Sequence, residues 1–153
     1  MTRRAVVVWA AVAVLAGCGG AASTRVDRQW LQNTTGLVAQ LRSDEVLTAN
    51  GTSSLAAARH ALHDDSDLYV LLVAYSDFGG CPQMLANTGG ALADRSLAPT
   101  LRSACDFLAR SAALFTRSAG GDDPHTLLAA AREAQRAWPL LDRAALELAS
   151  RSR

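Results

Sequence analysis

The C-terminal part of the chain places apolar or small residues at alternating spacings of four and three. These positions are Leu127, Ala131, Ala134, Trp138, Leu141, Ala145 and Leu148. Because such spacing keeps one face of a helix turned toward its neighbours, it predicts a long helix that packs on others at a shallow angle. Pro139 removes one backbone hydrogen bond from this helix and should kink it. Asp122 or Asp123 followed by Pro124 supplies the N-cap and the first helical residue.

Three further helices are predicted upstream, and glycines separate them. The expected bounds are 26–42, 53–78 and about 96–119. Asn50-Gly51 marks a turn, Gly79-Gly80 should end the second helix, and Gly120-Gly121 should end the third. The seam of the third helix again alternates four and three, at Leu101, Cys105, Leu108, Ala112, Phe115 and Ala119. Four helices with short links predict an all-α fold, an antiparallel four-helix bundle.

The first eighteen residues have a different character. Arg3 and Arg4 precede an uncharged apolar run from Ala5 to Ala16. The run is shorter than the roughly 20 residues of a membrane-spanning helix, but it has the length of the apolar core of a signal peptide. An N-terminal anchor and a secretory signal without a lipid are the alternatives.

Leu15-Ala16-Gly17-Cys18 resembles the lipobox of bacterial lipoproteins, an aliphatic residue, a small residue, Gly or Ala, and then Cys. The resemblance implies cleavage before Cys18, a diacylglyceryl group on its sulfur, and residence on the extracytoplasmic face of the cell membrane. The expected organisation is a signal peptide at 1–17, a lipidated tether at 18–25 and a helical domain at 26–153. The residues around Arg3-Arg4 match the twin-arginine motif poorly, which favours general secretion.

Export determines how the two remaining cysteines are interpreted. Cys81 and Cys105 form a candidate pair in an oxidising compartment, where disulfides persist. A disulfide would pin the connection after Gly79-Gly80 against the third helix, in which Cys105 is expected to face inward. Two buried thiols are the alternative. A catalytic role is not favoured, because neither cysteine lies in a Cys-x-x-Cys motif.

The mature part also resembles small uncharacterised helical lipoproteins of high-GC Gram-positive bacteria. The shared features are a cysteine at a helix end (Cys81), a second inside the next helix (Cys105), and a last helix rich in Ala and Arg between Leu127 and Leu148. All 15 basic residues of the chain are Arg. This resemblance implies no activity.

One cluster has metal-binding character. His60, His63, Asp64 and Asp67 lie at helical offsets of zero, three, four and seven, so they share a face, and imidazoles with carboxylates can ligate a transition metal. That face points away from the apolar seam of its helix, and no other helix offers a matching set of ligands. We therefore expect a solvated polar face, with no metal and no other cofactor.

The segment from Leu68 to Tyr75 is apolar on all sides, so it should be covered. The connection after Gly79-Gly80 is one candidate cover, and a partner, a ligand or the membrane are the others. A site for an apolar, lipid-like ligand is expected between the helices at Tyr69, Leu72 and Trp138. The alternative is that these aromatic side chains fill the core.

The sequence contains no nucleophile elbow, no phosphate-binding glycine loop and no dinucleotide-binding motif. Without Arg3 and Arg4, 13 basic residues face 14 acidic ones, which gives no electrostatic case for nucleic acid. We expect a non-enzymatic interaction or structural module of the cell envelope, anchored at Cys18, with an envelope protein as partner. The alternatives are a carrier of an apolar ligand and, less favoured, a metal-binding protein through His60 and His63.

Overall fold

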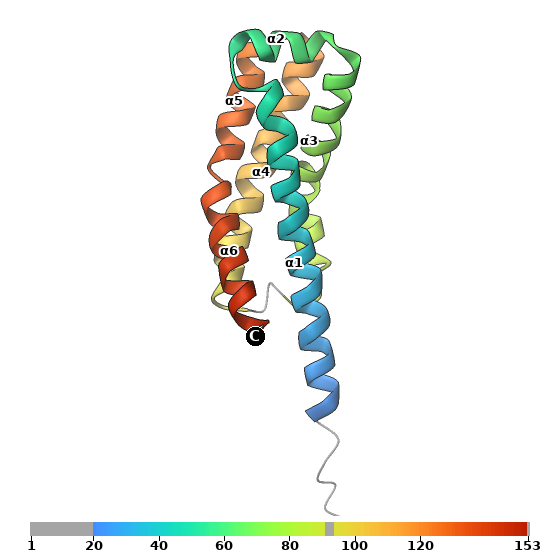
Figure 1. Cartoon of the computed structure of the whole chain (residues 1–153), viewed down its shortest axis with the longest axis vertical. Helices are drawn as coiled ribbons and strands as arrows, with labels where there is room; N and C mark the ends of the chain where they lie inside the picture. Colours follow the sequence, from blue (N-terminus) through green and yellow to red (C-terminus); the bar gives the residue numbers. More distant parts are fainter. Residues whose placement is uncertain (1–19, 91–93, 153) are drawn as a thin grey trace, which may run out of the picture.

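The computed structural model describes residues 20–90 and 94–152, and it is all-α in this part of the chain (Figure 1). It contains six α-helices there, namely α1 (Gly20–Gly51), α2 (Leu55–His63), α3 (Asp65–Ala86), α4 (Leu97–Gly121), α5 (Pro124–Gln135) and α6 (Trp138–Arg151). The predicted all-α class is confirmed. The signal peptide at 1–17, with Cys18, lies outside the described residues.

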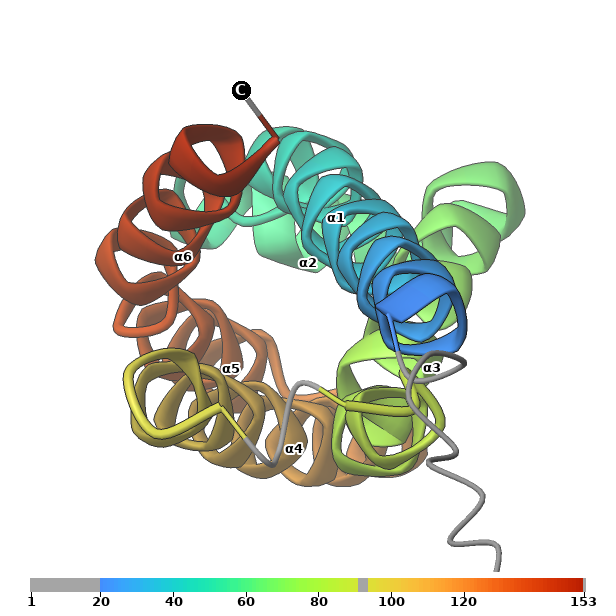
Figure 2. The same ribbon diagram turned by 90° about the horizontal axis from the view of Figure 1, so that it is seen from below.

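The long helices lie along one axis, and α2 crosses the end at which α1 finishes (Figure 1). The helix α1 contacts α3 and α6, whereas α4 contacts α3, α5 and α6. Seen along the axis, these helices surround a common centre (Figure 2). The chain therefore builds one core, to which every helix contributes buried side chains.

The core consists mainly of leucines, alanines and a group of aromatic side chains. Its largest fully buried members include Phe78, Leu41, Leu71, Leu97, Leu101, Leu108, Leu127, Leu141 and Leu148. Tyr75 stacks on Phe115 with 4.4 Å between ring centroids, and Phe78 meets Tyr75 edge-on at 5.3 Å. Trp138 lies 5.6 Å from the ring of Phe78. These rings pack against each other in the interior.

Cys81 of α3 and Cys105 of α4 form a disulfide, with 5.2 Å between their Cα atoms. Both residues are buried. The predicted pairing is therefore confirmed. Because the cross-link closes a loop with a sequence separation of 24, it removes denatured-state entropy worth about 3.5 kcal/mol on the chain-entropy model.

The helix α1 is longer than the predicted 26–42 at both ends. Residues 20–25 of the expected tether are helical. At the other end, the inner face of α1 continues through polar residues, because the side chains of Asp44 and Thr48 are almost fully buried. The Thr48 hydroxyl donates to the carbonyl oxygen of Glu45 at 3.0 Å, which satisfies it within the helix. Tertiary packing thus continues a helix that apolar spacing alone ends too early.

The predicted helix 53–78 is wrong at both ends and in the middle. Asp64 adopts an extended conformation and divides it into α2 and α3. The Asp64 carboxylate accepts the backbone N–H groups of Ser66 and Asp67 at 3.0 and 2.9 Å, so it caps α3. Ser54 caps α2, which therefore begins two residues after the predicted start.

Gly79-Gly80 does not end the second helix, because α3 continues through it and through Pro82 to Ala86. A Cβ atom on Gly79 would lie 3.4 Å from the Cβ of Ala112 on α4, so the glycine sits where the two helices approach closely. The disulfide at Cys81 fixes the next turn to α4. Packing against α4 therefore holds this stretch helical in spite of its sequence.

The last predicted helix is interrupted near Pro139, as expected. It ends at Gln135 and restarts at Trp138, with the proline in the first turn of α6. The predicted start is also confirmed, because the Asp123 carboxylate accepts the backbone N–H of His125 at 2.9 Å. Seam position Leu141 is fully buried, whereas Trp138 is only partly buried.

Candidate functional site

The break at Asp64 separates the four residues of the predicted metal-binding cluster. His63 Nε2 lies 3.2 Å from a carboxylate oxygen of Asp122, whereas His60 Nε2 lies 3.8 Å from one of Asp67. Asp64 is engaged in capping α3. Within the described ranges, no three His, Cys, Asp or Glu side chains gather closely enough to hold a metal ion. The two histidines thus face different carboxylates rather than a common point.

The residues predicted to bind an apolar ligand do not come together. Tyr69 and Leu72 are on the outer surface of α3, with exposed fractions of 67% and 48%. Trp138 packs instead on Phe78, which is nine residues from Tyr69 and therefore about 13 Å away along α3. The predicted helix 53–78 continues the apolar periodicity across Asp64, and this places Tyr69 between the helices. The structure corrects that placement.

A buried carboxyl group in α1 is a feature that the sequence analysis missed. The side chain of Asp44 is 1% exposed, and across the α1–α3 contact it faces Asp77. Gln40 Nε2 donates to Asp44 Oδ1 at 3.4 Å and to Asp77 Oδ2 at 3.2 Å. The second oxygen of Asp44, Oδ2, has no hydrogen-bond partner in the described part of the chain. Burial, with the nearby charge of Asp77, raises the pKa of Asp44 to about 6.

An apolar groove of about 520 Å³ lies between α1 and α6, which run side by side in Figure 2. Leu31, Val38 and Leu148 supply its larger apolar side chains, and three alanines supply small ones. The complete lining is Leu31, Gln32, Thr35, Val38, Ala39, Arg42, Ala145, Leu148, Ala149 and Ser152. The alanines leave the space open because their side chains end at Cβ. A volume of this size falls in the range of small-molecule sites.

The two ends of the groove differ. At one end Arg42 of α1 pairs with Asp142 of α6, with 3.0 Å between Nη2 and Oδ1. The other end lies beside Leu31 and Ser152, near the start of α1. From Leu31 to Arg42 the groove follows eleven residues of helix, which corresponds to about 16 Å. The groove is therefore mainly apolar along its length and has an ion pair at one end.

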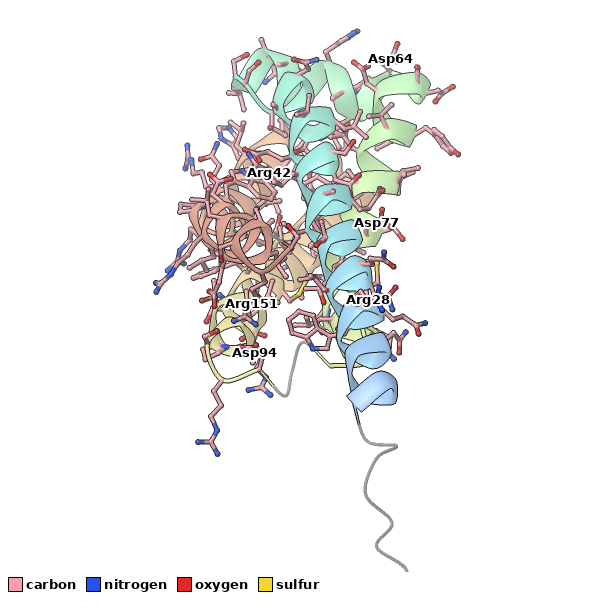
Figure 3. The ribbon with its side chains drawn as sticks, turned by 60° about the horizontal axis from the view of Figure 1, so that its bottom comes forward. Arg28, Arg42, Asp64, Asp77, Asp94 and Arg151 are labelled. Carbon is pink, nitrogen blue, oxygen red and sulfur yellow. A yellow bond between two sulfur atoms is a disulfide. The ribbon has the colours of Figure 1, made fainter. Side chains whose placement is uncertain are left out.

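A polar network fixes α6 beside the Ser152 end of the groove. Arg151 pairs with Asp94 and with Glu147, the latter at 2.8 Å between Nη2 and Oε1. Figure 3 shows Arg151 and Asp94 together, far from Asp64. The Arg151 guanidinium holds the pKa of Asp94 well below its usual range. The network ties the last turn of α6 to the segment that precedes α4.

The close approach of Trp30 to Gly90 positions the same end of α1. A Cβ atom on Gly90 would lie 1.5 Å from Cδ1 of the indole, so only glycine fits there. Arg151 approaches the same indole ring, and its guanidinium carbon is 5.8 Å from the ring centroid. Trp30 therefore spans the gap between the end of α3 and the end of α6.

Comparisons with known proteins found no match to any family model, curated protein or solved structure. Among the described residues, no helix has both the length and the apolar character needed to cross a membrane. In the part of the chain that the structure describes, the groove between α1 and α6 combines a volume of about 520 Å³ with a mainly apolar lining.

Proposed function

We propose that the chain is a lipoprotein of the extracytoplasmic face of the cell membrane, anchored by a diacylglyceryl group on Cys18, and that it acts without catalysis. Two observations support this. Leu15-Ala16-Gly17-Cys18 has the pattern of a lipobox, and the Cys81–Cys105 disulfide is a cross-link that persists outside the cytoplasm. Replacing Cys18 by Ala should abolish acylation of the chain, because the thiol that carries the diacylglyceryl group is lost. Continued acylation of that variant would contradict the anchor.

The finer architecture proposed is an antiparallel four-helix bundle. Its members are α1, α3, α4 and the fourth rod made of α5 and α6, with α2 across one end. The contacts of α1 with α3 and α6, and of α4 with α3 and α5, support a closed ring of four neighbours. The short connections between successive helices favour alternating directions.

Within this arrangement, the groove between α1 and α6 binds one acyl chain of a membrane phospholipid. The apolar lining of the groove is the observation that carries the proposal. The length also fits, because about 16 Å of groove matches the roughly 15 Å that one leaflet contributes to a hydrocarbon core of about 30 Å. Leu31 is nearer in sequence to Cys18 than Arg42 is, so the Leu31 end of the groove would face the membrane, from which the acyl chain enters.

Native mass spectrometry of the full chain, extracted from membranes in mild detergent, tests this proposal. The native protein should carry one phospholipid that denaturation removes, in addition to the covalent anchor. Ala39→Trp places an indole in the groove and should raise the Kd of the phospholipid by about tenfold, which corresponds to a loss of about 1.4 kcal/mol.

Ala113→Trp is the matched control, since Ala113 is an exposed alanine on α4 outside the groove. It should retain the phospholipid. A native protein that carries only its covalent anchor, or equal loss of lipid from both tryptophan variants, would contradict the groove as the site.

A second role, as an interaction module of the envelope, is favoured by one further observation. Large apolar side chains remain exposed on α1 and α3, away from the groove. Such a surface is what a partner protein would cover.

A further inference from the structure

Exposed apolar side chains gather on the outer surface of two neighbouring helices. Among the described residues, six large apolar side chains are exposed, and five of them belong to α1 or α3. These five, Val46, Leu47, Tyr69, Leu72 and Val73, are called the α1–α3 patch below. Val46 and Tyr69 are each 67% exposed. The sixth, Leu146, stands alone on α6 at 75%.

The patch crosses the seam between the two helices. Val46 and Leu47 line a depression of about 320 Å³ together with Val70 of α3. Val73 lies three residues after Val70, and Tyr69 lies four residues before Val73, so these side chains are neighbours on one helix surface. Val73 and Tyr69 therefore extend the apolar surface from this depression onto α3. The depression gives the patch a concave part that an inserted side chain can fill.

The charges around the patch have one sign along both helices. Helix α3 contains Asp65, Asp67 and Asp77 but no basic residue, and the part of α1 after Arg42 has no basic residue and adds the half-buried Glu45. This is unusual in a chain with 15 arginines. The adjacent α2 contributes Arg59 and two histidines, and both histidines lie beside aspartates. The border is thus predominantly acidic at neutral pH.

We propose that the α1–α3 patch binds an amphipathic segment of another envelope protein, whose apolar side chains are flanked by Arg or Lys. The apolar centre supplies the area to be buried, and the acidic border favours a basic partner. An anionic membrane surface is disfavoured, since it carries the same sign of charge as the border. A second copy docked by a twofold axis is disfavoured too, because it would place these aspartates against one another.

The patch also lies at the end of α1 that is remote from its start (Figure 1). A chain anchored near residue 18 would present this end away from the membrane, where a second protein can reach it. This step rests on the proposed role as an envelope interaction module, but it does not depend on the groove.

Photo-crosslinking in living cells tests the proposal with the full-length chain. A benzophenone amino acid in place of Tyr69 should give a discrete adduct, and the crosslinked peptide of the partner should be apolar with Arg or Lys nearby. The same amino acid in place of Leu146, an exposed apolar position outside the patch, should not give this adduct. An adduct with a second copy, with a phospholipid or with an acidic peptide, or no adduct, would overturn the proposal.

Val73→Asp in the chain that carries the probe should lower the adduct yield by about tenfold, since loss of an interface anchor costs 1 kcal/mol or more. Leu146→Asp is the matched control and should leave the yield unchanged. Both positions are exposed, so unchanged thermal melting should accompany both substitutions. Fractionation of the same cells separates the two proposals, because a membrane-bound chain without an adduct contradicts the patch, whereas a soluble chain contradicts the anchor.

Discussion

The two sides of α3 are built on different principles. Toward α4, its contact is aromatic and covalently fixed, with the Cys81–Cys105 disulfide and with Tyr75 stacked on Phe115 at 4.4 Å. Toward α1, its contact encloses the buried carboxyl group of Asp44. The difference teaches that a cross-link holds α3 to α4, whereas the protonation of one side chain, Asp44, contributes to the stability of the α1–α3 contact.

The electrostatics of the α1 side explain that contribution. Two carboxyl groups, Asp44 and Asp77, share one amide donor, Gln40. Burying a charged carboxylate without full hydrogen bonding costs free energy, so the neutral form of Asp44 is favoured in the folded state. Each prediction below perturbs one side of α3 and leaves the other intact.

The largest effect is expected from Phe78→Ala, which removes a ring packed on Tyr75, the residue that stacks on Phe115 of α4. Phe78 is fully buried and contacts both Tyr75 and Trp138. Its removal leaves a cavity between α3 and the start of α6, so the free energy of unfolding should fall by about 4 kcal/mol. Urea denaturation measures this fall. A change below that of the exposed control Leu146→Ala would mean that the aromatic group does not hold this side together.

The next effect concerns the disulfide. Replacing both Cys81 and Cys105 by Ala should lower the free energy of unfolding by about 3.5 kcal/mol, chiefly because the denatured chain regains entropy. The same loss should appear when the native protein is unfolded under reducing conditions. If reduction has no effect on the urea midpoint, packing alone holds α3 to α4.

The sequence predicted well those features that local chemistry specifies. Asp123 before Pro124 identified the start of α5, and Gly120-Gly121 identified the end of α4. Asp64 could also be recognised from the sequence as an N-cap, because the acidic residue Asp67 occupies the third helical position, where a capping box has Glu or Gln. The helical spacing of His60, His63, Asp64 and Asp67 instead predicts a solvated polar face on one continuous helix, in which Asp64 has no capping role.

Features that depend on tertiary contacts were not predicted. Gly79-Gly80 remains helical because α4 packs against it, which local spacing does not reveal. Asp44 lies three residues after the buried Leu41 and so continues the inner face of α1, but apolar periodicity treats an aspartate as exposed. The groove arises from the separation between α1 and α6, and no single segment specifies that distance. The only local sign of it is the pair of small residues Ala145 and Ala149 at a spacing of four.

Asp44→Asn tests the α1 side and should stabilise the protein at neutral pH. The pKa of Asp44 is raised to about 6 in the folded state, against about 4 when unfolded. Below pH 4 both states are protonated, so the penalty is absent. Between pH 4 and pH 6 the unfolded state ionises first, and stability is lost as the pH rises. Above pH 6 the loss is complete, at about 3 kcal/mol or less.

The comparison of Asp44→Asn with the native protein isolates this group from others. The lowered pKa values of Asp94 and Glu133 act in the opposite direction, because they add stability as the pH rises above their unfolded values. Their contributions cancel in the difference between the two proteins. Both proteins should be unfolded in urea at about pH 3.5 and about pH 7.5, which lie on either side of the range in which Asp44 titrates. A gap between their free energies of unfolding should appear only at the higher pH. A constant gap would mean that the pKa of Asp44 is the same in the folded and unfolded states.

Gln40→Ala should have the smallest effect, and it determines whether the two carboxyl groups act as a pair. Gln40 donates to both Asp44 and Asp77 through rather long hydrogen bonds of 3.4 and 3.2 Å. Its loss should lower the free energy of unfolding by about 1 kcal/mol at neutral pH. In the Asp44→Asn background the loss should be smaller, because the neutral amide at position 44 needs no shared donor. A double-mutant cycle measures the coupling. Additive effects would show that Gln40 merely covers the seam, and that the α1 side is sensitive to pH through Asp44 alone.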